Sequence, residues 1–319
     1  MQRANQITHV EMNDVGLTLQ LDVGKVTVCC PTSQIVRITM KMSDAGFSPP
    51  VQPEVMRSAP EILAQWAETK LEGDRITLPL GDYNLAFSSD PFQFQIIQNG
   101  EMVVASLPHS TFWQDRLGRL WHYQLKQDDD RYFGLGEKSG RLLRNNRRFR
   151  MGNVDAIGYD PELGDPLYKH IPFYMKHSVS RGQTVGIFLN NAIPSEFDFG
   201  SERSGYWEPY SRIGVDGGAL ALFILLGPTP GDVLRQYYSV TGFPALPPRA
   251  SLGYLGSTMA YTELPERSDE AVLGVVAQCE KLDIPLSGFH LSSGYTTGED
   301  GKRYVFNWHN GRFPDPEQF

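Results

Sequence analysis

The stretch ALALFILLGPTPGDVLRQYYSVTGFPALPP, residues 219–248, marks a change of architecture along the chain. It opens with an apolar run, residues 219–226, which predicts a strand, and the Gly-Pro pair that follows ends that strand. Thr229 is a suitable N-cap and Pro230 a suitable first residue for the helix that comes next. We expect this helix to stop at Gly242, after which three prolines form a rigid connector.

Before this stretch, from about residue 15 to residue 245, apolar and polar side chains alternate with period two. Such alternation predicts strands that bury one face, and Asn99-Gly100 supplies a hairpin turn. Helical periodicity is nearly absent apart from a short helix expected at Pro60–Lys70, inside the polar insertion Pro53–Gly73. The region therefore predicts a large antiparallel β-sandwich. The clearest alternating sets are Val36, Ile38 and Met40; Phe92, Phe94 and Ile96; and Trp121, Tyr123 and Leu125.

After the prolines the order changes to strand, helix, strand, which predicts a parallel βα repeat. We expect a strand at Ser251–Ser257, a helix at Ser268–Leu282 and a second strand at Leu286–Ser292. The two domains expected are therefore residues 1–245 and residues 246–319. The helix carries one apolar stripe suited to packing on a sheet, formed by Ala271, Val272, Val275, Val276, Cys279 and Leu282.

The second domain is short for the architecture that its repeat suggests. A complete (β/α)8 barrel takes about 250 residues, whereas only about 70 follow Pro248. Two interpretations remain open: a small α/β appendage, or a barrel whose remaining strands lie beyond Phe319. We favour the barrel, because Phe313-Pro314-Asp315-Pro316 stands where another helix would be expected to begin.

The composition is that of a folded protein without electrostatic support for binding nucleic acid or an anionic membrane. Hydrophobic residues make up 40% of the chain, and 37 acidic residues exceed 29 basic ones. No export signal or membrane span is visible, and the three cysteines, two of them adjacent, form no legible disulfide framework. We therefore expect a reducing, cytoplasmic location and a neutral ligand.

The segment 152–161 is dense in turn formers and hydrogen-bonding side chains, with Asn153 and Asp155 near its start. One interpretation is a loop that satisfies its own backbone through Asx turns. The other is a loop that reaches over a neighbouring pocket, where Asn153 and Asp155 bind sugar hydroxyls. The basic residues before it are expected to form a solvated face that pairs with Asp128–Asp130. This basic cluster comprises Arg141, Arg144, Arg147, Arg148 and Arg150.

Other kinds of site find little support in the sequence. His170 and His177 lie seven residues apart without a Cys or carboxylate at ligand spacing, so we expect no metal site. Phe133–Glu137 has two glycines but no Lys-Ser/Thr pair, which indicates a tight bend and not a phosphate loop. Ser139 and Ser204 lack the setting of a nucleophile elbow.

If the second domain is a barrel, the carboxyl ends of its strands face the active site. The residues at those ends would be Thr258, Met259 and Tyr261 after the first strand, and Ser292, Ser293 and Tyr295 after the second. His290 lies on the same side of its strand as Ser292, so it either points into the barrel or is a buried core histidine. The candidate substrate-binding residues in this domain are Met259, His290 and Ser292.

Four groups of residues resemble glycoside hydrolase family 31, the α-glucosidase and α-xylosidase family. They are Phe133–Glu137; Asn153–Tyr159 with Asp165–Tyr174; Gly227–Tyr237 with Gly242, Pro247-Pro248 and Leu252–Tyr254; and Phe306–Trp308 with Arg312–Pro316. They follow the family's order across residues 133–319, whereas residues 1–132 match only in their strand-rich character. The resemblance implies a galactose-mutarotase-like β-sandwich followed by the first βα units of a truncated (β/α)8 TIM barrel.

By this resemblance the chain is part of a retaining hydrolase that cleaves terminal α-linked sugars, with an α-glycoside as its ligand. Retention uses two carboxylates about 5 Å apart, and the family carries both on later barrel strands. We therefore expect no catalytic residue up to Phe319, no hydrolysis by this stretch alone and no cofactor. Asp155 matches the loop aspartate through which the family contacts substrate. The sequence leaves open whether the protein forms a homo-oligomer.

Two departures from the family pattern concern the sugar pocket. The family's second strand commonly carries Asp-Ile-Asp-Tyr, whose first Asp holds hydroxyls of the terminal sugar, where this chain has Ser292-Ser293-Gly294-Tyr295. Its first strand commonly offers Arg-Tyr, where this chain has Thr258-Met259. Losing a charged acceptor removes hydrogen bonds of about 1.5 to 3 kcal/mol each. We expect a differently substituted or configured α-glycoside; the alternatives are a non-catalytic carbohydrate-binding module and an inactive homologue.

Overall fold

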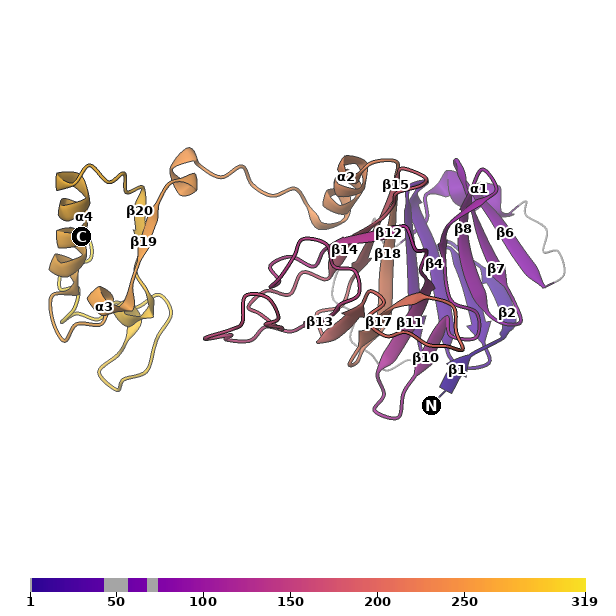
Figure 1. The fold of residues 1–319 in the computed structure, drawn as a ribbon, viewed down its shortest axis with the longest axis horizontal. Coiled ribbons are helices and arrows are strands. Elements are labelled where there is room, and N and C mark those ends of the chain that lie inside the picture. The colour runs from indigo at the N-terminus through magenta and orange to yellow at the C-terminus, as the bar shows by residue number, and fades with distance from the viewer. Residues whose placement is uncertain (1, 43–56, 68–73) are drawn as a thin grey trace. The chain divides into compact units, whose positions relative to one another are not determined.

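The computed structural model describes residues 2–42, 57–67 and 74–319, and the chain divides into two compact units. The first unit is Met1–Phe243 and the second is Pro244–Phe319. The first is built from large sheets and the second from helices around a small sheet (Figure 1). Each unit is described by itself.

The first unit contains an eight-stranded, a six-stranded and a four-stranded sheet, and all the strand pairs in them are antiparallel. In spatial order the eight-stranded sheet contains β12 (Asp130–Gly134), β14 (Phe173–Ser178), β15 (Gln183–Leu189), β18 (Leu220–Gly227), β5 (Ile35–Lys41), β4 (Lys25–Thr32), β3 (Leu17–Leu21) and β2 (Ile7–Met12). The six-stranded sheet contains β1 (Gln2–Ala4), β10 (Phe112–Gln114), β11 (Leu120–Leu125), β17 (Tyr210–Val215), β16 (Ser195–Asp198) and β13 (Arg148–Met151). The four-stranded sheet contains β6 (Arg75–Leu80), β7 (Tyr83–Ser88), β8 (Gln93–Gln98) and β9 (Glu101–Ala105). The predicted antiparallel sandwich is confirmed.

The three sheets share one apolar core. In β8, Phe94 and Ile96 are fully buried and Gln95 between them is half-buried, as the alternation predicts. Asn99 and Gly100 join β8 to β9 with φ angles of 52° and 79°, the left-handed conformations that a two-residue hairpin requires. The predicted hairpin is therefore confirmed.

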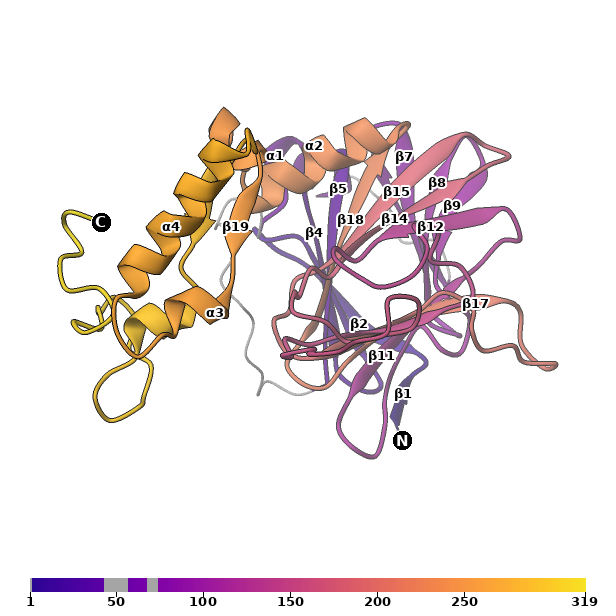
Figure 2. The same cartoon turned by 60° about the vertical axis from the view of Figure 1, so that its left-hand side comes forward.

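The centre of the eight-stranded sheet departs from the predicted pattern because it is buried on both faces. On β5, Arg37 and Thr39 are each only 5% exposed, although they alternate with the core residues. The helix α2 (Pro230–Thr241) lies along β15 and β18 (Figure 2) and packs Val233 against Phe223. The expectation of one buried face is wrong here, and this helix covers the second face over β15 and β18.

Both ends of α2 follow the sequence prediction. The Thr229 hydroxyl accepts a hydrogen bond from the Asp232 amide at 3.2 Å, and the Asp232 carboxylate accepts one from the Thr229 amide at 3.2 Å. This reciprocal pair is a capping box. At the other end Gly242 adopts a φ of 93°, and its amide donates to the carbonyl of Tyr238. The predicted start and stop of the helix are confirmed.

A short helix, α1 (Pro60–Ala67), lies where the insertion was expected to be helical. Its Ile62 and Trp66 are buried, and Trp66 Nε1 donates to the Pro79 carbonyl at 2.9 Å. The expected helix reached Lys70, and its last residues, like the beginning of the insertion at Pro53, lie outside the described residues.

In the second unit β19 (Leu255–Ser257) and β20 (Gly288–His290) pair in parallel. The helix α4 (Ser268–Lys281) comes between them in the chain, so the predicted parallel βα repeat is confirmed. The remaining elements are η2 (Arg249–Leu252), α3 (Met259–Thr262) and η3 (Ser293–Thr296).

Both strands of the second unit are shorter than predicted. The first is shortened because residues 249–253 close a 3-10 turn, in which the amides of Ser251 and Gly253 donate to carbonyls of the same turn. On α4 the predicted apolar stripe is buried at Val272, whereas its last member, Leu282, is 63% exposed. Leu282 is the C-cap and follows the final helical residue.

Candidate functional site

The first candidate region is loop 152–172, which connects β13 to β14 and contains the predicted loop contacts to substrate. Its base is held by Asp165, whose carboxylate lies 2.6 Å from Lys138 Nζ and also accepts a hydrogen bond from the Arg150 amide. The Lys138 side chain is fully buried, so water screens this ion pair only weakly. The loop therefore projects from a fixed base.

Within the loop, Asn153 and Asp155 contact the opposite arm at Tyr168. Asn153 Nδ2 donates to the Tyr168 carbonyl at 2.9 Å, and the Val154 amide donates to the Leu167 carbonyl at 3.3 Å. The Asp155 carboxylate accepts a hydrogen bond from the Tyr168 hydroxyl, which raises the pKa of that phenol. All three residues are exposed. The structure thus brings a carboxylate, an amide and a phenol together where a ligand can reach them.

The self-contained turn that the sequence also allowed is made by Asp160. Its Oδ1 accepts hydrogen bonds from the amides of Glu162 and Leu163, each at 2.8 Å, which forms an Asx turn. An ionised carboxylate has about four acceptor positions, so Asp155, bonded to one phenol, retains capacity for sugar hydroxyls. Of the two interpretations of this segment, the Asx turn therefore describes Asp160, and ligand binding by Asp155 stays a prediction.

Sequence reasoning missed Tyr168 as a member of this group. The available signal was a phenol in a loop dominated by turn formers, but its partners lie on the other arm and its position depends on the loop's path. The loop also exposes apolar side chains that the sequence analysis did not single out: Val154, Ile157, Tyr159 and Leu163.

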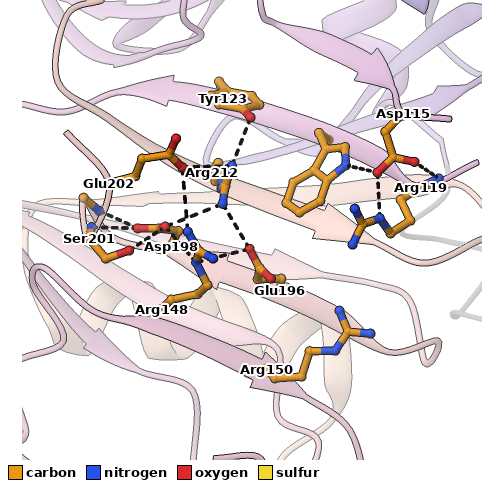
Figure 3. A network of polar contacts seen from close by, with 12 residues as sticks. Asp115, Arg119, Tyr123, Arg148, Arg150, Glu196, Asp198, Ser201, Glu202 and Arg212 are labelled. Atoms are coloured by element: carbon orange, nitrogen blue, oxygen red, sulfur yellow. Dashed lines mark hydrogen bonds and ion pairs between the residues drawn. The ribbon is translucent and has the colours of Figure 1, made fainter. Parts of the chain in front are cut away.

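Arg148, one member of the basic cluster before the loop, takes part in an ion-pair network on the six-stranded sheet (Figure 3). Arg148 Nε lies 3.1 Å from Asp198 Oδ2 and 3.5 Å from Glu196 Oε1. Arg212 Nη2 lies 3.3 Å from the same Glu196 oxygen, and Arg212 Nη1 donates to the Tyr123 hydroxyl at 3.3 Å. These charges are matched across neighbouring strands, which favours a structural role for the network.

Beside this network the indole of Trp121 lies between two guanidinium groups. The Cζ atoms of Arg119 and Arg212 are 5.1 Å and 5.0 Å from the ring centroid, a cation–π arrangement. Asp115 Oδ2 accepts hydrogen bonds from Arg119 Nε at 2.6 Å and from Trp121 Nε1 at 3.2 Å (Figure 3). Two cation–π contacts and a hydrogen bond at Nε1 therefore hold the ring.

The predicted pairing of the basic cluster with Asp128–Asp130 is wrong. β13 pairs with β16 in a register that sets Arg148 opposite an acidic residue of that strand, so its carboxylate partners come from the neighbouring strand. Asp129 instead accepts hydrogen bonds from Ser180 and Ser178, which hold its pKa below the usual range.

The second candidate region is the carboxyl edge of β19 and β20, where Ser257 and His290 lie opposite each other. Met259 opens α3 directly after β19 and is 48% exposed. His290 is exposed in this stretch of chain, and its place inside a barrel, whether facing the active site or buried in the core, stays a prediction. Ser292 is half-buried, and its amide donates to the His290 carbonyl at 3.0 Å. Parallel pairing thus brings Met259, His290 and Ser292 to one edge of the sheet.

The segment after β20 is held in place by Arg312 and by aromatic packing. Arg312 Nη1 donates to the Gly294 carbonyl at 2.7 Å, and the centroids of the Tyr295 and Trp308 rings are 5.0 Å apart. The His309 amide also donates to the Tyr295 carbonyl at 2.7 Å. These contacts fix the turn that follows Ser292 and give the Trp308 and Arg312 motifs a structural role.

The segment Phe133–Glu137 forms the predicted tight bend. Gly134, Leu135 and Gly136 all have positive φ, and the Leu135 amide donates to the Phe173 carbonyl at 2.8 Å. At Gly134 a Cβ atom would lie 2.7 Å from that same carbonyl oxygen, so the strand approaches too closely for any side chain there.

The two histidines considered as metal ligands make ordinary hydrogen bonds. His170 Nε2 lies 3.2 Å from the Asn191 carbonyl, and His177 Nδ1 lies 3.0 Å from Thr184 Oγ1. Within residues 2–42, 57–67 and 74–319, no group of three or more His, Cys, Asp or Glu side chains is placed to hold a metal ion. In the same part of the chain, no helix has the length and apolar character needed to cross a membrane.

Comparison with known proteins connects both units to one family. Residues 25–198 match the glycosyl hydrolase 31 N-terminal galactose mutarotase-like domain, and residues 244–319 match the glycosyl hydrolases family 31 TIM-barrel domain. Alpha-glucosidase 2 of Bacillus thermoamyloliquefaciens is 29% identical over 300 residues, which cover 93% of this chain and 35% of that protein. Alpha-xylosidase XylQ of Lactiplantibacillus pentosus is 28% identical over 313 residues, or 95% of this chain and 37% of that protein.

A solved structure shows the same fold. The Flavobacterium johnsoniae GH31 dextranase FjDex31A, complexed with glucose, matches 97% of this chain and 36% of that chain with a TM-score of 0.80 at 23% identity. The chain thus spans about a third of the length of the relatives that it matches. Its sandwich and its parallel βα unit follow one another in the order of the two matched domains. The chain belongs to glycosyl hydrolase family 31.

Proposed function

We propose that this chain supplies part of the substrate-binding surface of a retaining hydrolase that releases terminal α-linked sugars. The observation that carries the proposal is the match to both family 31 domains, with relatives named as an α-glucosidase and an α-xylosidase. The boundary between the binding sandwich and the barrel is proposed to lie near residue 245.

Binding groups are proposed in each unit by itself. In the first unit the Asp155 carboxylate can accept hydrogen bonds from sugar hydroxyls. The Asn153 amide can both donate to and accept from them. In the second unit the edge of β19 and β20 offers Met259, His290 and Ser292, a thioether, an imidazole and a hydroxyl. Retention needs two carboxylates, one as nucleophile and one as acid and base, so none of these second-unit residues is given a catalytic role.

The sugar is proposed to differ from an ordinary terminal α-glucose. Ser292 stands where the family resemblance implies an aspartate that holds sugar hydroxyls, and a hydroxyl group makes weaker hydrogen bonds than a carboxylate. The two relatives' names already cover two different sugars, so family membership leaves the choice of sugar open.

The test is an assay of the complete gene product on 4-nitrophenyl α-glycosides of glucose, xylose, galactose, mannose and N-acetylglucosamine. We expect hydrolysis with release of an α-configured product and a preference for a sugar other than glucose. Release of a β-configured product would contradict the retaining mechanism, and a clear preference for α-glucose would contradict the altered pocket.

A cytoplasmic location is also proposed. Cys29 and Cys30 are buried and free, and Cys279 is free and half-buried, as is usual for proteins kept in a reducing compartment. Fractionation of the source cells with an antibody to this chain tests the proposal, and recovery outside the cytoplasm would contradict it.

A further inference from the structure

A polar cleft of about 740 Å³ lies on the first unit, away from loop 152–172. Turns from two sheets line it: β4–β5 and β14–β15 in the eight-stranded sheet, and β6–β7 and β8–β9 in the four-stranded sheet. Loop 152–172 joins β14 at the first residue of the strand, Phe173. The cleft lies beyond the last residue of β14, where Ser180 is part of its lining. A six-residue strand spans about 17 Å, so the two places are separate.

The centre of the cleft is a group of two amides around a buried phenol. Gln183 Nε2 donates to Gln98 Oε1 at 2.8 Å, and both side chains are half-buried. Tyr83 is only 6% exposed, and its hydroxyl hydrogen-bonds with the same two amides. These mutual contacts hold the side chains in fixed positions before any ligand arrives, which lowers the entropy cost of binding.

The walls of the cleft are fixed in the same way. Arg181 Nη1 donates to the Met102 carbonyl at 2.6 Å, and Gln34 Oε1 accepts a hydrogen bond from Gln236 Nε2 at 2.5 Å. Asp82 and Glu101 add exposed carboxylates at the rim. Amides are the commonest polar side chains of the lining, which also carries two serine hydroxyls, a phenol, two carboxylates and one guanidinium.

This chemistry selects a class of ligand. Two carboxylates against one guanidinium disfavour an anion, the polar lining disfavours an apolar ligand, and the described residues contain no metal-holding group. Amides both donate and accept hydrogen bonds, as do the neighbouring hydroxyls of a neutral sugar. Volumes of about 300 to 1,000 Å³ are typical of small-ligand sites, so the cleft has room for an oligosaccharide.

We propose that the cleft around Gln98, Gln183 and Tyr83 is a second carbohydrate-binding site, separate from loop 152–172. It holds a stretch of glycan on the sandwich by hydrogen bonds from the two amides and the rim. The choice of an α-linked glucose oligosaccharide as the probe rests on the proposed function, whereas the site itself rests on the cleft.

The test is isothermal titration calorimetry of the 319-residue chain with maltotriose and, separately, with the β-linked cellotriose. Gln98→Ala and Gln183→Ala each remove one amide, and we expect binding to weaken roughly three- to tenfold, the range for one lost hydrogen bond. Gln95→Ala is the matched control, because Gln95 lies on the same strand, is also half-buried and does not line the cleft. We expect it to bind like the unsubstituted chain.

Two further variants distinguish failure of the cleft site from failure of the proposed function. Asp82→Ala alters an exposed rim residue, so it tests the cleft even if removal of an amide lowers the melting temperature. Asp155→Asn alters the other candidate region. Maltotriose binding that weakens in Asp155→Asn but not in the cleft variants overturns the second site and leaves the proposed function standing.

The remaining outcomes are equally decisive. Cellotriose binding that weakens in the cleft variants, with no binding of maltotriose, supports the site and contradicts the choice of an α-linked glycan as its ligand. Absence of binding by either sugar overturns the site, as does equal weakening in Gln95→Ala.

Discussion

Lys138 Nζ lies 2.6 Å from Asp165 Oδ1 with the lysine side chain wholly removed from solvent. This pair joins the bend after β12 to the loop that carries Asp155, so the position of the loop depends on it. A buried ion pair adds little net stability, but loss of one partner leaves a charge without compensation.

We therefore expect Asp165→Asn to lower the free energy of unfolding by about 3 kcal/mol, measured by urea denaturation followed by circular dichroism. The control is Glu137→Gln, which breaks the Lys169–Glu137 pair between the same bend and the same loop. Both of those side chains are more than half exposed, at 56% and 64%, so its effect should be below about 1 kcal/mol. Equal losses in the free energy of unfolding for the two substitutions would show that burial does not determine how much each ion pair contributes to stability.

The protein should lose stability in weak acid because of His122. The imidazole is fully buried against Phe94 and Phe112, and burial lowers its pKa from the ordinary 6.5 to about 4. Between these values the unfolded chain binds a proton that the folded chain does not. The stability present above pH 6.5 therefore decreases as the pH falls and is lost by about pH 4, a change of about 3 kcal/mol.

Urea denaturation at pH 4, 5, 6 and 7 measures this change, and His122→Gln should flatten the profile over that range. His9→Gln is the matched control, because His9 is exposed and should leave the profile unchanged. A profile that is equally steep in both variants would assign the acid sensitivity to other groups.

Asp155→Asn should impair substrate binding without destabilising the fold. Because the side chain is exposed, we expect the melting temperature to stay within about 1 °C, while kcat/KM of the complete gene product falls roughly 10- to 100-fold. Asp160→Asn is the control, since Asn also forms an Asx turn and the loop should keep its shape. An unchanged kcat/KM in Asp155→Asn would remove this residue from the binding surface.

Ser292→Asp should move the substrate preference toward α-glucosides. The substitution supplies the charged acceptor that the family resemblance implies at this position, and one such hydrogen bond corresponds to roughly 10- to 150-fold in kcat/KM. Ser293→Asp places the same charge one residue later and should give no such gain. A loss of all activity in Ser292→Asp, with Ser293→Asp unaffected, would show that Ser292 has a role other than the one proposed.

The parts of the fold that sequence alone predicted are those governed by neighbours in the chain. The capping box of Thr229 and Asp232 spans four residues, and the Asn99-Gly100 hairpin needs only two left-handed residues. Local residues determine such features, so they can be predicted without knowledge of the tertiary structure.

The errors occurred where partners come from distant segments. Arg37 is buried and lies over the ring of Phe223, a β18 residue that clusters with α2 almost 200 residues later, and Arg148 pairs with Asp198 because β13 adjoins β16. In the candidate site, too, residues given by a local motif were predicted and residues brought in by the path of the chain were not. Asp155 was identified from its motif, whereas Tyr168 was not, because the path of the loop brings the two together.

The position of Trp121 between Arg119 and Arg212 makes one face of the six-stranded sheet optically observable. Two positive charges beside an indole alter its excited state, so the part of the chain's fluorescence that comes from Trp121, one of five tryptophans, should change when that strand surface is lost. The sandwich therefore contains an intrinsic probe of its own unfolding, and no dye need be attached to follow it.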